Sequence, residues 1–92
     1  MDSKSIVLKV AANSVPATVA GALANNVREG RSVEMIVMGP HSVNQAIKAV
    51  AIARDYLRND FVELSCRPEF LHILIDGVEK SAIKLVIQTF GV

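Results

Sequence analysis

The sequence predicts a single α/β domain over residues 1–92, a two-layer sandwich in which strands and helices follow in the order β-α-β-α-β-β. Segments with a helical apolar period alternate with short β-branched runs, a pattern typical of strand-helix-strand units. Asp76-Gly77 between two extended segments indicates a closing hairpin. Because 92 residues are too few for three layers, we expect two helices on one face of a four-stranded mixed sheet.

The first expected strand covers residues 6–10 (IVLKV), a run dominated by β-branched residues. The polar residues 1–5 before it are expected to be flexible. The first helix should begin at Pro16, which suits the first helical position, with Asn13 and Ser14 as capping candidates. Its apolar residues fall on one helical stripe, made of Val19, Ala20, Leu23, Ala24 and Val27.

The second strand-helix pair follows a predicted stop at Gly30, a glycine suited to the position after a helix C-cap. Residues 32–38 (SVEMIVM) should form the second strand, and residues 42–59 the second helix with Ser42 as its N-cap. The apolar stripe of this helix contains small residues, so its neighbour should pack closely. The predicted stripe is Val43, Ala46, Ile47, Val50, Ala51, Ala53 and Leu57.

The last third of the chain is expected to form a long hairpin. Residues 61–66 (FVELSC) read as a third strand, and Pro68, which cannot donate to a ladder, should bulge or break it. Residues 70–75 (FLHILI) resume the extended run, and residues 80–88 return after the turn with alternating polarity.

Composition limits the classes of partner. The net charge is +1, so nucleic acid would have to be bound by a local patch. Hydrophobic residues make up 51% of the chain and aromatic residues only 4%, an aliphatic surplus that favours a homodimer with a second buried face. The single cysteine, Cys66, fits a reducing compartment. With no apolar run long enough for a membrane and no cleavable leader, we expect a cytoplasmic protein.

Few residues offer catalytic or metal-binding chemistry. His41, His72 and Cys66 are the only histidines and cysteine, which is too small a set for a zinc site. No nucleophile or phosphate-loop motif is present. We therefore expect no enzyme activity, no catalytic residue, no metal and no cofactor.

Polar residues follow the first two expected strands. Open α/β sheets bind ligands at the carboxyl ends of their strands, where helix N-termini offer backbone N–H groups to anions. We expect the two loops to lie together and to form a nucleic-acid-binding edge. Its candidate residues are Lys9, Asn13, Ser14, His41, Ser42, Asn44, Gln45 and Lys48. The same residue types also serve as ordinary caps and loop residues, and this second interpretation stays open.

Three stretches of the chain resemble the bacterial stage V sporulation protein S family. They are VAGALA (19–24), NQAIKAVAIAR (44–54) and IDGVEKSAIKLVI (75–87), and the spacing of SCRPEF is similar too. The order of elements more distantly resembles the Alba superfamily of small dimeric nucleic-acid-binding proteins. The resemblance implies an Alba-like fold, a homodimer and a cytoplasmic regulatory role in sporulation or development, without a known reaction.

The sequence departs from the Alba superfamily at its basic positions. Alba proteins carry cations in the first loop, at the start of the second helix and on the hairpin, where this chain has Asn13, His41 and an acidic tip at residues 76–79. Weak binding of DNA or RNA is therefore expected rather than strong coating. The alternative is a protein-protein scaffold in spore or cell-division assembly, without nucleic-acid binding, whose polar edge receives a protein partner.

Overall fold

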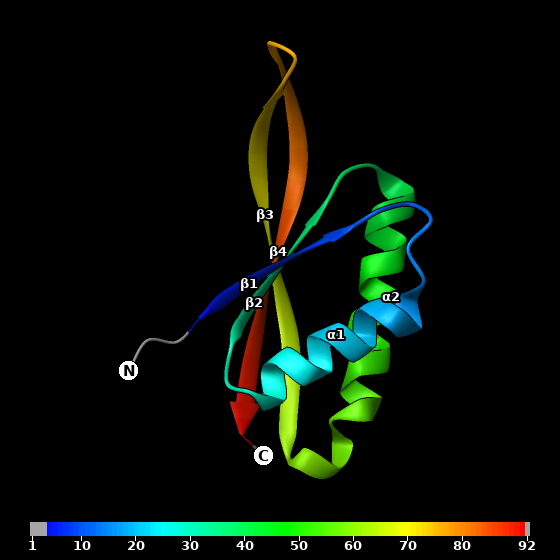
Figure 1. The fold of residues 1–92 in the computed structure, drawn as a ribbon, viewed down its shortest axis with the longest axis vertical. Coiled ribbons are helices and arrows are strands. Elements are labelled where there is room, and N and C mark those ends of the chain that lie inside the picture. Colours follow the sequence, from blue (N-terminus) through cyan, green and yellow to red (C-terminus); the bar gives the residue numbers. More distant parts are fainter. Residues whose placement is uncertain (1–3, 92) are drawn as a thin grey trace.

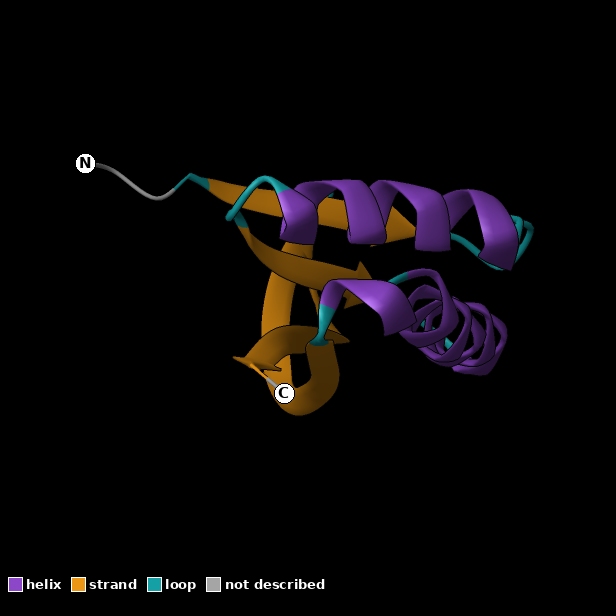
Figure 2. Cartoon of the chain, turned by 90° about the horizontal axis from the view of Figure 1, so that it is seen from below, coloured by secondary structure: helices purple, strands orange, loops and turns teal. Residues whose placement is uncertain are grey.

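The computed structural model describes residues 4–91 and has the expected order of elements (Figure 1). Two helices lie on one side of a twisted four-stranded mixed sheet, which confirms the two-layer α/β prediction (Figure 2). The elements are β1 (Ser5–Val10), α1 (Pro16–Arg28), β2 (Ser32–Val37), α2 (Pro40–Tyr56), a 3-10 turn (Arg58–Asp60), β3 (Val62–Ile75) and β4 (Val78–Gly91).

The strand order in the sheet is β1-β2-β4-β3. β1 and β2 are parallel, with Val10 opposite Val37, whereas β4 is antiparallel to both of its neighbours. The last strand of the chain therefore lies inside the sheet, and β1 and β3 form its edges.

The core lies between the helices and the sheet. Leu23 of α1, Met35 of β2 and Leu57 at the end of α2 are fully buried. Three alanines of α2 are also fully buried, which lets α1 and α2 approach closely: Ala46, Ala49 and Ala53. The prediction that small residues bring a close neighbour to this helix is confirmed.

The start and end of the first helix agree with the sequence prediction, but its N-cap does not. It begins at Pro16 and stops before Gly30, whose φ of 77° suits glycine. Its N-cap is Val15, however, without a side-chain cap, so Asn13 and Ser14 are not capping residues. The N-terminal prediction was also too broad, because Ser5 already pairs with Ser32; residues 1–3 lie outside the described part of the chain.

The second helix begins two residues earlier than predicted and ends earlier too. Gly39, with φ 88° and ψ 159°, is the N-cap and directs Pro40 into the first helical position. Because this conformation is open almost only to glycine, the loop itself sets the start of the helix. The predicted N-cap, Ser42, lies inside the first turn, and the C-terminal residues tighten into the 3-10 turn.

The buried stripe of α2 is rotated relative to the prediction. Ala49 is fully buried, whereas Ile47 is 46% exposed and Ala51 is exposed. A helix rich in alanine has several nearly equivalent apolar stripes, and close packing selects the one with the smallest residues. Ile47 and Ala51 are thereby left on the outer surface.

The predicted break at Pro68 was wrong, because β3 runs through it as one 14-residue strand. An edge strand tolerates proline, since its nitrogen need not donate to a second neighbour. β2 pairs with β4 only as far as Ile83, so from Leu71 to Ala82 the two strands of the hairpin pair only with each other. We call this projecting segment, with Phe70 at its base, the arm (70–82); it rises past α2 (Figure 1).

We expect Ala49→Leu to destabilise the protein by about 1–3 kcal/mol, because the larger side chain enters a fully packed core. Ala17→Leu, on the exposed side of α1, is the matched control and should change stability by about 0.5 kcal/mol or less. Urea unfolding of both variants measures the difference. Equal stability of the two variants would contradict the close packing of α2.

Candidate nucleic-acid interface

The loops that follow β1 and β2 lie together, as predicted. Their strands are parallel neighbours that end at Val10 and Val37 in register. The side-chain amide of Gln45 on α2 donates from Nε2 to the backbone oxygen of Ser14 at 2.8 Å, which joins the second helix to the first loop. We call residues 11–15, residues 38–39 and the first turns of both helices the loop edge.

The two serines of the loop edge hold the backbone rather than cap the helices. The Ser14 hydroxyl accepts a hydrogen bond from the Ala11 N–H at 2.8 Å. The Ser42 side chain is 1% exposed, and its Oγ accepts from the Met38 N–H at 2.9 Å and lies 2.6 Å from the Met38 oxygen. Ser42 therefore shapes the second loop from inside.

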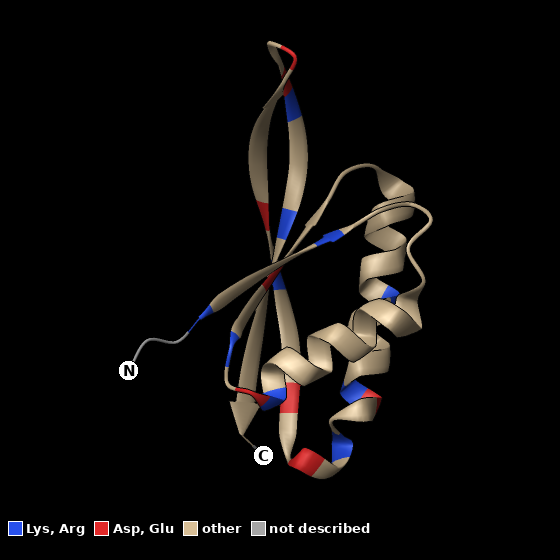
Figure 3. Ribbon diagram, viewed as in Figure 1, with Lys and Arg blue, Asp and Glu red and all other residues tan. Residues whose placement is uncertain are grey.

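Neither helix N-terminus at the loop edge is neutralised by a side chain. Neither N-cap, Val15 or Gly39, makes a side-chain cap, and neither first turn contains an acidic residue. Because Pro16 and Pro40 have no N–H, the first donors of the two helices are the N–H groups of Ala17 and His41, which keep a partial positive charge without a neutralising carboxylate. No Asp or Glu occurs in residues 3–28 or 35–54, so the loops and the first turns carry no acid (Figure 3).

The cations near the loop edge differ from those elsewhere in the protein. Every arginine forms an ion pair: Arg28 with Asp60, Arg31 with Glu29, Arg54 with Glu63, Arg58 with Asp55 and Arg67 with Glu69. Lys9 and Lys48 have no carboxylate partner among residues 4–91. Their charges are therefore available to a ligand.

The predicted residues occupy three kinds of position. Lys9, at the end of β1, alternates with the inward-facing Leu8 and Val10 and so lies on the uncovered face of the sheet. Lys48 lies about one turn after Gln45 on α2, on the side that meets the first loop. The other exposed candidates are Asn13, His41 and Asn44, whereas Ser14 and Gln45 are half-buried.

The remaining chemistry-bearing residues are isolated. Cys66 is a half-buried free thiol packed against the core, and His72 lies on the arm 3.8 Å from Glu79. Within residues 4–91 no three or more His, Cys, Asp or Glu side chains come together as metal ligands would. Nor does this part of the chain contain a helix with the length and apolarity needed to cross a membrane.

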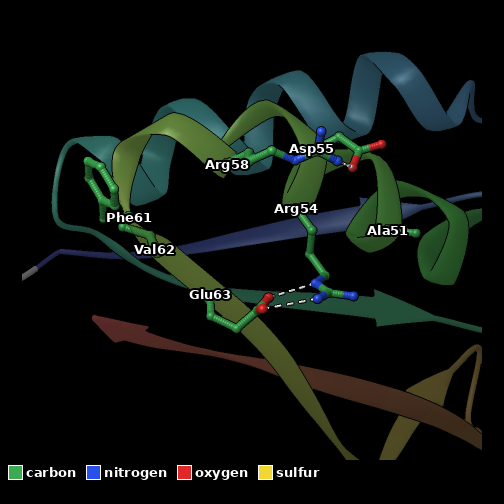
Figure 4. Close-up of a pocket in the computed structure, with 7 residues that line it drawn as sticks. All are labelled: Ala51, Arg54, Asp55, Arg58, Phe61, Val62 and Glu63. Carbon is green, nitrogen blue, oxygen red and sulfur yellow. Dashed lines mark hydrogen bonds and ion pairs between the residues drawn. The ribbon is translucent and has the colours of Figure 1, made fainter. Parts of the chain in front are cut away.

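A hollow of about 450 Å³ lies between the C-terminal half of α2 and the start of β3, and sequence reasoning missed it. Ala51 and Val62 contribute apolar surface, and Phe61, with φ 57° and 70% exposed, stands at one end (Figure 4). Bulky residues rarely adopt this left-handed backbone, so the turn holds the ring outward under strain. The other lining residues are Arg54, Asp55, Arg58 and Glu63.

A bidentate ion pair closes one side of this hollow. Arg54 donates from Nε and Nη2 to the two carboxylate oxygens of Glu63 at 2.6 and 3.0 Å (Figure 4). This pair raises the pKa of Arg54, and together with the Leu64 N–H it lowers the pKa of the Glu63 carboxyl. Glu63 is therefore held in its charged form.

The fold and the loop edge define a small two-layer α/β protein in which two helix N-termini without side-chain caps lie at an edge whose loops and first turns carry no acidic residue. The family model for stage V sporulation protein S matches residues 6–90, nearly the whole chain. The chain belongs to the stage V sporulation protein S family, as the sequence resemblance indicated. This membership implies a role related to sporulation.

We expect Gly39→Ala to destabilise the protein by about 1–3 kcal/mol, because alanine does not tolerate φ 88° with ψ 159°. Gly21→Ala is the control: this helical glycine has open space around it, and the change should stabilise by about 0.5–1 kcal/mol. Thermal unfolding of both variants provides the comparison. A neutral Gly39→Ala variant would contradict the assigned loop conformation.

Glu63 should make the free energy of unfolding decrease as the pH becomes acidic. Its folded pKa is lowered from the ordinary 4.5, so its contribution is complete above that value and is lost as pH falls through the folded pKa. Urea unfolding at about pH 6 and about pH 3 should show a larger loss for the wild type than for Glu63→Gln. The same loss in both proteins would count against the Arg54–Glu63 pair.

Proposed function

We propose that this protein is a dimeric, cytoplasmic regulatory protein of sporulation that binds nucleic acid weakly through its loop edge, without enzyme activity. The observation that carries the proposal is the joint presence of two uncapped helix N-termini and two lysines that have no carboxylate partner among residues 4–91, in loops and first turns without acidic residues. Backbone N–H groups at helix N-termini bind phosphates, and lysine side chains neutralise them. The resemblance to the Alba superfamily supports the same function.

Each candidate residue has a distinct role in this proposal. Lys9 and Lys48 neutralise phosphates from the two sides of the loop edge, and the exposed Asn13, His41 and Asn44 donate hydrogen bonds. The half-buried or buried Ser14, Ser42 and Gln45 position the loops through the contacts described above.

Charge limits the strength of this binding. Because every arginine is paired with a carboxylate, only a few cations can displace counterions from the nucleic acid. The slope of log affinity against log salt should therefore be shallow. All four aromatic side chains are exposed, but none lies at the loop edge. Tyr56 is on α2, Phe61 in the turn before β3, Phe70 on β3 and Phe90 on β4. Base stacking therefore contributes little at that edge.

A protein-protein scaffold is the second candidate function. The exposed apolar residues of the arm and its acidic tip favour a protein contact over a nucleic acid at that end of the molecule. A scaffold would be indifferent to charge reversal at the loop edge.

We expect Lys48→Glu and Lys9→Glu to weaken binding to labelled duplex DNA, single-stranded DNA or RNA, and each to lower the slope of log affinity against log salt by about one. Fluorescence anisotropy at low and physiological salt measures this. Lys80→Glu is the matched control. It changes the net charge equally, at a lysine of the arm that also has no carboxylate partner among residues 4–91, and it should have little effect on binding. Equal losses in all three variants would contradict the loop edge as the binding site, and no binding by the wild type would favour the scaffold.

A further inference from the structure

The outer side of β1 is an open strand edge. β1 pairs only with β2, and its six residues stay in register with that strand without a bulge or a proline. The Ser32 N–H on β2 donates to the Lys4 oxygen at 3.0 Å, so the even-numbered residues of β1 direct their backbone groups to β2. Ser5, Val7 and Lys9 therefore direct their N–H and C=O groups outward, away from the sheet.

Half-buried apolar side chains border this edge on the helix face. Leu8 of β1 and Val19 of α1 are both partly buried and pack against the core. Val19 lies nine residues before Arg28, which is two and a half helical turns, and Arg28 donates to the Tyr56 oxygen on α2. Val19 is therefore on the side of α1 that faces away from α2, along the β1 edge (Figure 2).

The uncovered face of the same edge is apolar and positive. Val7 is 48% exposed there, and Lys9 has no carboxylate partner among residues 4–91. No Asp or Glu occurs in residues 3–28, so neither β1 nor α1 carries an acid. A partner with carboxylates beside its strand backbone is complementary to this edge.

We infer that the β1 edge accepts an extended segment of a partner protein in which acidic and apolar residues alternate. The segment adds a strand antiparallel to β1, the more stable orientation, and its backbone pairs with Ser5, Val7 and Lys9. Its acidic side chains lie beside Lys9 on the uncovered face, and its apolar side chains cover Leu8 and Val19 on the helix face. The inference does not depend on the proposed binding of nucleic acid.

Other occupants fit this edge less well. Two copies of this chain paired through β1 would bring Lys4 and Lys9 of both onto one short ladder without a carboxylate on either strand. Like charges on neighbouring strands are destabilising, and edge lysines are a common device against such self-pairing. Nucleic acid offers phosphates to Lys9 but has no peptide backbone that could pair with the outward N–H and C=O groups.

A synthetic peptide tests the charge pattern. A fluorescein-labelled peptide of about eight residues, alternating valine and aspartate, is long enough to cover β1. It should bind the intact protein at least about tenfold more tightly than a matched peptide that alternates valine and lysine, as measured by fluorescence anisotropy at physiological salt. No binding at about 1 mM protein, or equal binding of the two peptides, would overturn the inference.

N-methylated peptides test the strand pairing with the protein unchanged. Residues opposite Lys9 in an antiparallel ladder share its face and direct their N–H groups to β1, so the aspartates donate the hydrogen bonds. N-methylation of the aspartates should therefore weaken binding at least about tenfold, whereas N-methylation of the valines should change it by less than about threefold. An N-methyl-aspartate peptide that binds as tightly as the unmodified one would overturn the inference.

Charge reversals separate the β1 edge from the loop edge. Lys9→Glu should weaken binding of the unmodified peptide at least about threefold, because repulsion replaces attraction beside its aspartates. Lys48→Glu, on α2, changes the net charge equally and should change binding by less than about twofold, since salt screens distant charges. Equal losses would show a polyanion bound at the loop edge and would overturn the inference. Nucleic-acid binding by a protein that binds no peptide would overturn this inference and leave the proposed function standing.

Discussion

The position of β4 inside the sheet is the constraint on which the rest of the structure depends. β4 is the last strand in the chain, yet it pairs with β2 on one side and β3 on the other. β3 is thereby forced to the edge, and the hairpin, longer than the body it joins, must project as the arm. The same pairing leaves β1 and β2 as parallel neighbours, whose loops then meet at one edge.

Local pattern was enough to identify both α-helices and the order of the strands, because the hydrophobic period and the turn and cap residues of this chain agree. Pro16, Gly30 and Asp76-Gly77 each mark a boundary through a backbone preference that tertiary context does not change. The prediction errors arose where contacts between segments distant in the sequence decide the local structure or the burial. Pro68 is tolerated only because its strand is at an edge, and Ala49 rather than Ile47 is buried because α1 requires the smaller residue.

The candidate interface could be predicted in part, because part of it follows from the order of the elements. Strand-helix alternation alone places the two loops together, so Ser14 and Gln45 could be paired from the order of elements, and the absence of acids is visible in the sequence. The burial of Ser42 could not be predicted from the sequence, since it depends on the backbone conformation of Gly39. The hollow also escaped prediction, because Arg54 and Glu63 meet only after the chain turns between α2 and β3.

A dimer, as proposed, would carry two loop edges, and this would matter for a weak interface. Each edge has few cations without an ion-pair partner among residues 4–91, so neither would bind nucleic acid strongly alone. A strand of nucleic acid long enough to reach both edges would make its second contact intramolecularly, at a high effective concentration. Affinity would then depend on the length of the nucleic acid more than on the charge of either edge.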